Sequence, residues 1–248
     1  VSEESCLRVK EYYKLFVKGD IEFTDANTAE MCKLTENAYR DVNIAFANEM
    51  AKMCQAAGVN AWEVQKLCNK HPRVNILMPG PGVGGHCIAV DPWFLVSSFP
   101  EATRLIATSR NVNDSMPLFA AEQTDKILGD TSRKISILGI TYKPDVDDVR
   151  ESPVLKIAEI LRQKGYEVAI HDPLVAPGKY ANTDLEVCLQ DSDMLVIGVN
   201  HKAFKNLDLQ KVFSLMRTKV IYDTRNFIDR TEANKAGFAY YLLGCGSE

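Results

Sequence analysis

One cysteine stands in a sequence context that could support covalent chemistry. Cys87 ends the segment PGPGVGGHC, residues 79–87, whose glycines let the backbone approach a ligand closely and adopt positive φ angles. A cysteine directly after such a loop, and just before a helix start, would have backbone N–H groups nearby to stabilise a thiolate or an oxyanion. Cys87 is therefore a candidate nucleophile, and a buried cysteine after a tight turn is an equally good interpretation.

Three polar side chains could assist such a nucleophile. Asp91 follows Cys87 by four residues and could orient a lysine or a water molecule near the thiol, although it also fits the N-cap of a helix that has Pro92 at its first position. Lys33 and Asn37 are spaced i, i+4 and share one helix face, where a lysine and an amide could hold an oxyanion or a reacting hydroxyl. Charged neighbours of this pair favour a plain solvated face instead.

The histidines and the other cysteines do not suggest a metal site. His71, His171 and His201 have no mutual metal-ligand spacing, and the seven cysteines contain no CxxC pair. His86 is adjacent to Cys87 in the chain, but a Cys–His protease pair needs contact in space, which chain neighbours rarely achieve. We therefore expect no bound metal, and a cysteine protease is a poor interpretation.

Cations in the second half of the chain stand where a parallel sheet binds ligands. Lys143 and Arg150 follow the first expected strand of that half, and Arg225 follows the last. The carboxyl ends of parallel strands form the ligand crevice of open α/β sheets, so these cations suggest a phosphate site, with exposed loop charges as the alternative. Arg73, in the sequence HPRVN, could also bind phosphate or carboxylate. No GxGxxG follows the first strand, so this half lacks the dinucleotide fingerprint.

The first half of the chain is expected to be helical. Within residues 1–26 we expect an amphipathic helix and a short strand at 20–23. A long helix follows, with Asn27 and Glu30 as a variant capping box and Gly58 as its stop, which gives roughly 30 residues and about 45 Å. Such a helix either pairs with another copy or covers its own domain. Further helices are expected over 61–69, 91–97 and 100–128, the last interrupted by Pro117.

The second half alternates strands with helices, which predicts a parallel sheet with right-handed crossovers. Ser152 and Pro153 are typical of a helix start, and Gly165 of a helix end. A linker is expected at 129–134. Strands are expected over 134–140, 166–173, 194–199 and 220–223, and helices over 153–164, 184–190 and 203–216.

Composition narrows the class of protein. Hydrophobic residues make up 46% and charged residues 25% of the 248 residues, as in ordinary globular proteins. The net charge of −4 argues against nucleic-acid binding, which needs a basic stripe. No apolar run reaches the roughly 18 residues of a membrane span, and the start lacks a signal-peptide pattern. Seven cysteines without a pairing pattern indicate reduced thiols, so we expect a cytoplasmic protein.

Three long segments together resemble one family. AEMCKLTENAYRDVNIAFANE, HPRVNILMPGPGVGGHCIAVDPWF and GITYKPDVDDVRESP are similar to segments of the nucleotide-sugar 6-dehydrogenases, the UDP-glucose/GDP-mannose dehydrogenase family. The resemblance covers nearly the whole chain. The version GPGVGGHCIAVDPWF is similar to the branch that acts on UDP-N-acetylmannosamine.

The resemblance implies a domain organisation. Residues 1–26 would be the remnant of an N-terminal NAD-binding domain, and because no Met begins the chain we expect a piece of a longer protein. Residues 27–130 would form an all-helical central dimerisation domain around the long helix. Residues 131–248 would form a Rossmann-like parallel-sheet domain that binds UDP. The expected fold class is thus α/β, in a homodimer or a higher homo-oligomer.

The resemblance also implies a reaction. It is an NAD-dependent, four-electron oxidation of the C6 hydroxyl of a UDP-N-acetylhexosamine, namely UDP-N-acetylmannosamine to UDP-N-acetylmannosaminuronate. Cys87 matches the thiolate that forms a thiohemiacetal and then a thioester. Lys33 matches the acid/base or oxyanion lysine, Asn37 its partner amide, and Asp91 an aspartate that assists proton movement. UDP-N-acetylglucosamine, UDP-N-acetylgalactosamine or UDP-glucose remain alternative substrates, and a nucleotide-sugar-binding and dimerisation module without turnover is an alternative of another class.

Other positions match family contacts to substrate and cofactor. Arg150 matches a residue that touches NAD, and Arg73 matches one that reaches the site of the neighbouring subunit. Substrate contacts are implied for Arg40, His71, Arg73, Gly84, Tyr142, Lys143 and Arg225.

Overall fold

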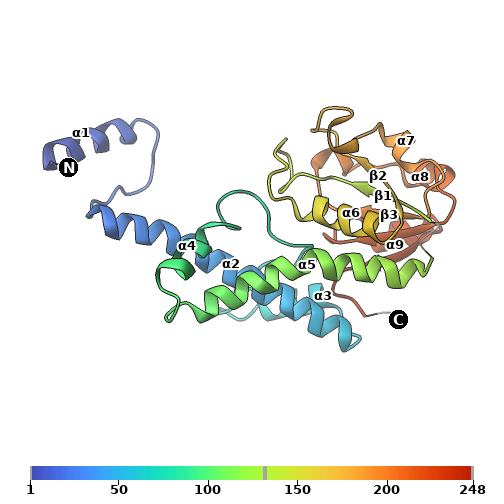
Figure 1. Ribbon diagram of the computed structural model, residues 1–248, viewed down its shortest axis with the longest axis horizontal. Helices are drawn as coiled ribbons and strands as arrows, with labels where there is room; N and C mark the ends of the chain where they lie inside the picture. The colour runs from blue at the N-terminus through green and yellow to red at the C-terminus, as the bar shows by residue number, and fades with distance from the viewer. Residues whose placement is uncertain (1, 131–132, 247–248) are drawn as a thin grey trace.

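The molecule has a helical part and a sheet part. The computed structural model describes residues 2–130 and 133–246, so the linker expected at 129–134 falls partly outside the described residues, at 131 and 132. Figure 1 shows helices built by the first half of the chain on one side, the sheet on the other, and α5 (Arg104–Leu128) lying along both. The expected α/β fold is confirmed. The other helices of the first half are α1 (Glu3–Lys14), α2 (Ala26–Ala56), α3 (Ala61–Cys68) and α4 (Asp91–Ser98).

The long helix α2 forms as expected but with a different cap. Its 31 residues start after Asp25, not at Asn27. The Asp25 carboxylate accepts hydrogen bonds from the backbone N–H of Thr28 at 3.0 Å and from its hydroxyl at 2.6 Å, which satisfies one of the free N–H groups at the helix start. Gly58, with φ of 70°, follows the helix end. The buried face of α2 is rich in alanine, which allows α4 and α5 to pack closely.

Three local predictions in this half are wrong. Residues 20–23 are extended but form no strand, because no strand of the described sheet lies beside them to complete the hydrogen bonds. Pro117 lies inside a continuous α5, where burial of neighbours such as Met116 outweighs the lost helical hydrogen bond. Asp91 is the first residue of α4 rather than its N-cap, which is Val90; its carboxylate is engaged by α2 instead.

The second half forms a five-stranded parallel sheet with the order β2-β1-β3-β4-β5. This order reverses direction between β1 and β3, and ligands of such sheets bind beyond the carboxyl ends of the strands at that switch point. The strands are β1 (Lys134–Leu138), β2 (Glu167–His171), β3 (Met194–Ile197), β4 (Val220–Asp223) and β5 (Ala239–Leu242). The helical segments are α6 (Pro153–Gln163), η1 (Lys179–Ala181), α7 (Leu185–Leu189), η2 (Lys202–Phe204), α8 (Leu209–Leu215) and α9 (Arg230–Lys235).

The second half follows the sequence predictions except near its C-terminal end. Ser152 caps α6 and Gly165, with φ of 99°, ends it. The single helix expected over 203–216 is instead η2 and α8, because the Asp208 carboxylate caps a new helix by accepting two backbone N–H groups. α9 and β5 were not expected, since the short sequence AYYL of β5 lacks the β-branched run typical of a buried strand.

The two parts share a hydrophobic core across α5 and α6. Buried side chains of α5, such as Met116, belong to the same cluster as Ile157 of α6. At the surface of this contact the Asp125 carboxylate accepts hydrogen bonds from Lys164 at 2.6 Å and from the Tyr166 hydroxyl at 2.7 Å. The sheet part is therefore held against the helical part, and segments from both can form one site.

The end of β5 returns to the first half of the chain. The Trp62 indole donates to the carbonyl of Leu243 at 2.8 Å. The backbone N–H of Ala61 donates to the carbonyl of Gly244 at 3.0 Å, and Gly244 in turn donates to the Gln55 side chain at 3.2 Å. These contacts tie α2 and α3 to the last strand. Over the ranges that the structure describes, no helix has both the length and the hydrophobicity required to cross a membrane.

Candidate active site

A cavity of about 420 Å³ opens where the helical part meets the sheet part. Its walls come from α2, from the glycine loop (residues 79–87) with its flanking residues, from the loop after β1 and from the turn after β4. The cavity thus lies at the carboxyl ends of the strands, as expected. The polar or reactive side chains that line it are Lys33, Asn37, Arg40, His86, Cys87, Tyr142, Lys143 and Arg225. Gly84 also lines it.

Asp91 joins the two polar side chains of α2. Its Oδ2 accepts a hydrogen bond from Lys33 Nζ at 3.3 Å and from Asn37 Nδ2 at 2.5 Å. Asn37 is buried and Asp91 half-buried, whereas Lys33 is exposed, so the pair on α2 lies at the border between the solvated face and the buried face. The lysine, amide and carboxylate form one hydrogen-bonded cluster, of which Lys33 and Asn37 line the cavity that holds Cys87.

Cys87 is half-buried and contacts its neighbour in the chain. Its Sγ lies 3.4 Å from Nδ1 of His86, so the expectation that adjacent residues would not meet is wrong. Two of the backbone N–H groups near the thiol, those of Val90 and Asp91, donate to the Cys87 carbonyl at 3.0 and 2.8 Å; stabilisation of the thiolate by backbone N–H groups stays a prediction. The group in contact with the Cys87 thiol is thus the His86 imidazole.

Two glycines of the loop pack closely against side chains of the sheet part. A Cβ atom at Gly80 would lie 2.6 Å from Nη1 of Arg225. A Cβ atom at Gly85, whose φ is 83°, would lie 2.8 Å from the ring of Tyr142. Both distances are shorter than real contacts, and the backbone conformation of Gly85 disfavours any other residue. The loop therefore brings its backbone against two side chains of the sheet part.

The turn after β4 holds Arg225 at the cavity. The buried Asp223 carboxylate accepts backbone N–H groups from Arg225, Phe227 and Ile228 at 2.7–2.8 Å, which fixes the turn. Arg225 Nε donates to the Gly198 carbonyl at 2.9 Å. Burial lowers the pKa of the Arg225 guanidinium to about 10, against the opposing effect of Asp223. The side chain is still a cation at neutral pH and can bind an anion.

The loop after β1 is held by a buried histidine. His201 Nδ1 accepts the backbone N–H of Asp145 at 3.0 Å, and the other ring nitrogen lies 3.1 Å from Asp172. Because Nδ1 accepts, the network assigns the proton to Nε2, which donates to the carboxylate. This contact anchors the loop that carries Tyr142 and Lys143 to the cavity.

A buried polar network supports the glycine loop from below. The N–H of Gly80 donates to Asn48 at 2.9 Å, Asn48 donates to Asn113 at 2.9 Å, and Asn113 donates to Asp41 at 2.8 Å. Arg110 forms an ion pair with Asp41, whose pKa is raised by burial. Sequence reasoning did not find this network. The sequence feature that could have indicated this network is the spacing of Asp41 and Asn48, which lie two turns apart on the alanine-rich face of α2.

Four predicted site residues do not themselves line this cavity. Asp91 contacts Lys33 and Asn37, which do line it; the other three lie at the surface. His71 and Arg73 are exposed in the turn after α3, where the N–H of Arg73 donates to the His71 ring at 3.2 Å. Arg150 is exposed and forms a two-point ion pair with Asp148 through Nε and Nη2, at 3.0 and 2.6 Å. The implied roles of His71 and Arg73 at a neighbouring subunit, and of Arg150 at NAD, stay predictions.

The described residues do not form a dinucleotide-binding turn. Gly80, Gly82 and Gly85 have the GxGxxG spacing, but no strand precedes them and the next helix begins only at Asp91. The fingerprint needs a strand before the glycines and a helix directly after them, so this chain offers NAD no such cradle in its described ranges. No group of three or more His, Cys, Asp and Glu side chains in those ranges is placed to hold a metal ion.

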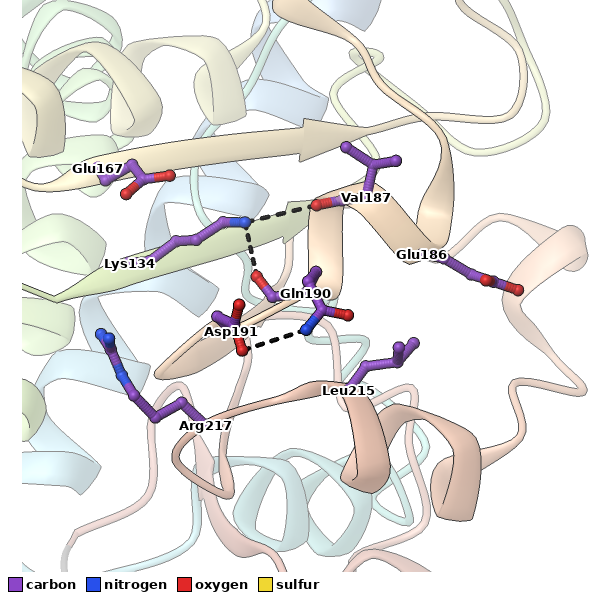
Figure 2. Close-up of a pocket in the computed structure, with 8 residues that line it drawn as sticks. All are labelled: Lys134, Glu167, Glu186, Val187, Gln190, Asp191, Leu215 and Arg217. Carbon is purple, nitrogen blue, oxygen red and sulfur yellow. Dashed lines mark hydrogen bonds between the residues drawn. The ribbon is translucent and has the colours of Figure 1, made fainter.

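A larger cavity, of about 530 Å³, lies at the opposite edge of the sheet. Figure 2 shows Lys134 reaching the C-terminal end of α7, where its Nζ donates to the carbonyls of Val187 and Gln190 at 3.4 and 2.7 Å. Arg217, on the other wall, donates to Asp193 at 2.8 Å. Both cations are engaged by the protein itself, and this amino-terminal edge is not where parallel sheets bind ligands.

Comparison with known families matches both halves of the chain. The model of the UDP-glucose/GDP-mannose dehydrogenase family, central domain, matches residues 27–115. The model of the UDP binding domain of the same family matches residues 136–230. The cavity lies between these two matched regions, because it takes residues from both.

Relatives and solved structures agree with this match. UDP-N-acetyl-D-mannosamine dehydrogenase of Methanocaldococcus jannaschii is 48% identical over 99% of this chain and 58% of its own length. The UDP-D-ManNAc dehydrogenase structure from Pyrococcus horikoshii has 41% identity and a TM-score of 0.88 over 99% of this chain and 59% of that one. The structure of UDP-N-acetyl-mannosamine dehydrogenase from Staphylococcus aureus has 43% identity and a TM-score of 0.86, over 98% of this chain and 58% of that one.

This chain spans less than two thirds of the length of each of these relatives. Within that span the two matched domains, the shared fold and the identity agree. The chain belongs to the UDP-glucose/GDP-mannose dehydrogenase family, and it carries the central and UDP-binding domains of that family.

Proposed function

We propose that this chain is the substrate-binding and thiol-bearing part of an NAD-dependent dehydrogenase that oxidises C6 of UDP-N-acetylmannosamine. The observation that carries the proposal is the meeting of Cys87 with several cations in one cavity. A nucleotide sugar has a diphosphate at one end and the C6 hydroxyl at the other, and the cavity offers cations for the first and a thiol for the second. The relatives named for this activity support the choice of sugar.

The nucleotide end would bind at the carboxyl edge of the sheet. Lys143 and Arg225 enter the cavity there, with Arg40 contributed by α2. Guanidinium groups suit phosphate oxygens because they donate two parallel hydrogen bonds. The turn built around Asp223 keeps Arg225 ready for this role, since one nitrogen is committed to Gly198 and the other nitrogens remain at the cavity.

The sugar end would meet Cys87. In the proposed capture step the thiolate forms an S–C bond with the C6 aldehyde, the carbonyl π electrons move to oxygen, and that oxygen gains a proton to give a thiohemiacetal. The cluster of Lys33, Asn37 and Asp91 has two N–H donors to hold that oxygen and a carboxylate to orient them. Covalent capture would keep the aldehyde from escaping.

Hydride acceptance needs another part of the protein. NAD, when bound, supplies the hydride acceptor of such oxidations. The described residues lack the turn that cradles a dinucleotide, and the chain covers 58% of the length of its M. jannaschii relative. We propose that NAD is held by a region of the complete protein outside this chain, and that domain divisions at 26/27 and 130/131 separate the functional units.

Calorimetry with UDP tests the nucleotide site on the chain as it stands. We expect measurable binding, which Arg225→Ala and Lys143→Ala each weaken roughly tenfold because each removes a charge-assisted contact. Lys235→Ala, which removes an exposed cation of α9 outside the cavity, is the matched control and should bind as the unaltered chain does. UDP affinity indifferent to both cavity substitutions would place the nucleotide elsewhere.

Competition and turnover separate the remaining alternatives. UDP-N-acetylmannosamine should displace UDP more effectively than UDP-glucose or UDP-N-acetylglucosamine; the reverse order would contradict the proposed sugar. With NAD and substrate, the chain alone should produce no NADH. In this respect it should behave like a binding module without turnover. The complete protein should produce NADH under the same conditions, and its failure to do so would leave the binding-module interpretation in place.

A further inference from the structure

His86 is the side-chain partner of the thiol in the cavity. Its Nδ1 lies 3.4 Å from Cys87 Sγ. The backbone positions this contact. Gly85, at φ of 83°, turns the chain just before His86, and the N–H of Gly85 donates to the carbonyl of Arg150 at 3.0 Å. His86 is exposed, and in the described part of the chain its ring has no other hydrogen-bond partner.

We propose that His86 is the base that takes the proton of the Cys87 thiol. The S–H bond breaks, its electron pair stays on sulfur, and the proton passes to the unprotonated Nδ1, which leaves a thiolate beside an imidazolium. No oxidant is needed. The proposal deepens the proposed function, on which it rests, by naming the group that makes the nucleophile.

Opposite charges flank the two partners. Asp148 and Arg150 form an ion pair beside the loop. Hydrogen bonds from Arg150 are the main cause that lowers the pKa of Asp148 to about 2, and the charge of His86 contributes to the same shift. Hydrogen bonds to Asp148 are the main cause that raises the pKa of Arg150, and the charge of Cys87 contributes. The Asp148 carboxylate therefore lies within electrostatic range of the imidazole, and the Arg150 guanidinium within range of the thiol, which favours a thiolate–imidazolium pair.

The other ionisable groups of the cavity act on both partners. Cations favour the thiolate and disfavour the imidazolium, whereas the Asp148 carboxylate favours the imidazolium. The ion pair of Lys33 with Asp91 has almost no net charge, so it acts little on His86 and Cys87. The other ionisable groups that line the cavity or lie within electrostatic range of the pair are Lys33, with its partner Asp91, Arg40, Tyr142, Lys143, Asp148, Arg150 and Arg225.

The pH dependence of Cys87 alkylation tests this proposal without substrate or NAD. The chain is treated with iodoacetamide over a range of pH, and modification at each cysteine is followed by peptide mass spectrometry. Since only the thiolate reacts, the rate reports the thiolate fraction. At neutral pH Cys87 of the unaltered chain should be alkylated faster than Cys68, which is exposed outside the cavity and is the internal reference.

His86→Asn keeps a side chain of similar reach but cannot accept the proton. The midpoint of the Cys87 profile should rise by about one pH unit or more, so that the rate at neutral pH falls roughly tenfold while the rates converge at high pH. His171→Asn, which alters a histidine of β2 outside the cavity, should leave the profile in place. Circular dichroism confirms that each variant is folded.

Two results would overturn the proposal. One is a Cys87 profile that is the same with and without His86. The other is a changed plateau rate with an unchanged midpoint, which would assign His86 a steric role. Neither depends on nucleotide binding, so failure here is distinct from failure of the calorimetric test of the proposed function.

Discussion

Single carboxylates decide how this cavity is arranged. A cap at Asp91 would have directed its side chain to its own helix, whereas the observed contacts direct it across to Lys33 and Asn37, 58 and 54 residues away in sequence. Asp223 acts on its own turn and fixes Arg225. In both cases a short acidic side chain holds a longer or more mobile partner at the cavity, so that less conformational freedom is lost when a ligand binds.

A side chain added at Gly80 would test the position of Arg225 in the cavity. Gly80→Ala should displace Arg225, because the new Cβ atom would lie 2.6 Å from Nη1. We expect UDP affinity to fall at least threefold, measured by calorimetry, with a modest loss of thermal stability. Gly19→Ala is the control, since a Cβ there meets nothing within 4 Å. Unchanged UDP affinity in Gly80→Ala would contradict the assignment of Arg225 to the nucleotide.

The elements that carry local start and stop signals could be predicted from sequence. α6, bracketed by Ser152 and Gly165, formed where expected, because caps act over a few residues. The strand at 20–23 did not form and β5 was missed, because pairing depends on neighbours distant in sequence. The same limit applies to the cavity: its individual residues could be named, but the support of Gly80 by Asn48, across 32 residues, could not.

The sheet has its own carboxylate that joins elements. Asp193, just before β3, accepts the N–H of Lys134 in β1 at 3.0 Å, the Thr218 hydroxyl at 2.8 Å and Arg217 Nε at 2.8 Å. Burial alone raises its pKa, but these hydrogen bonds outweigh burial and lower the pKa to about 2. Asp193 therefore joins the amino ends of three strands, and it does so more strongly when it is ionised.

The stability contributed by Asp193 should depend on pH. Its folded pKa is below the unfolded value of about 3.9, so the contribution is present above that value and is lost as the pH falls toward 2. Asp193→Asn should lower the free energy of unfolding by about 2 kcal/mol at neutral pH and by much less near pH 2. Urea denaturation of both proteins at the two pH values measures this; a difference independent of pH would show that the charge is not what matters.

In the described part of the molecule, α2 presents an apolar stripe that the fold does not cover. Tyr39, Phe46 and Met53 on α2 are 67%, 54% and 58% exposed and lie seven residues apart, which places them along one line of the helix. α2 is 31 residues long, and its other face is buried by α4 and α5. We expect this stripe to form the core of the homodimer that the sequence suggested.

A charge in the middle of the stripe tests the dimer. Phe46→Glu should convert a dimer into a monomer at micromolar concentration in sedimentation velocity, because a buried carboxylate without a partner opposes association. Val187→Glu, at a 59% exposed position of α7, should remain dimeric. A monomer before substitution, or a dimer that survives Phe46→Glu, would remove α2 from the interface and leave Arg73 without a neighbouring site.

The hydrogen bond between Trp62 and Leu243 limits how early α3 can complete its packing during translation. The carbonyl that accepts the Trp62 indole N–H lies 181 residues downstream, and the N–H of Ala61 likewise depends on Gly244. Domains commonly fold in the order of synthesis, yet here α3 cannot reach its final contacts until Leu243 and Gly244 have been translated. Nascent chains stalled before Leu243 should therefore expose Trp62 to solvent and to proteases, and chains extended past Gly244 should protect it.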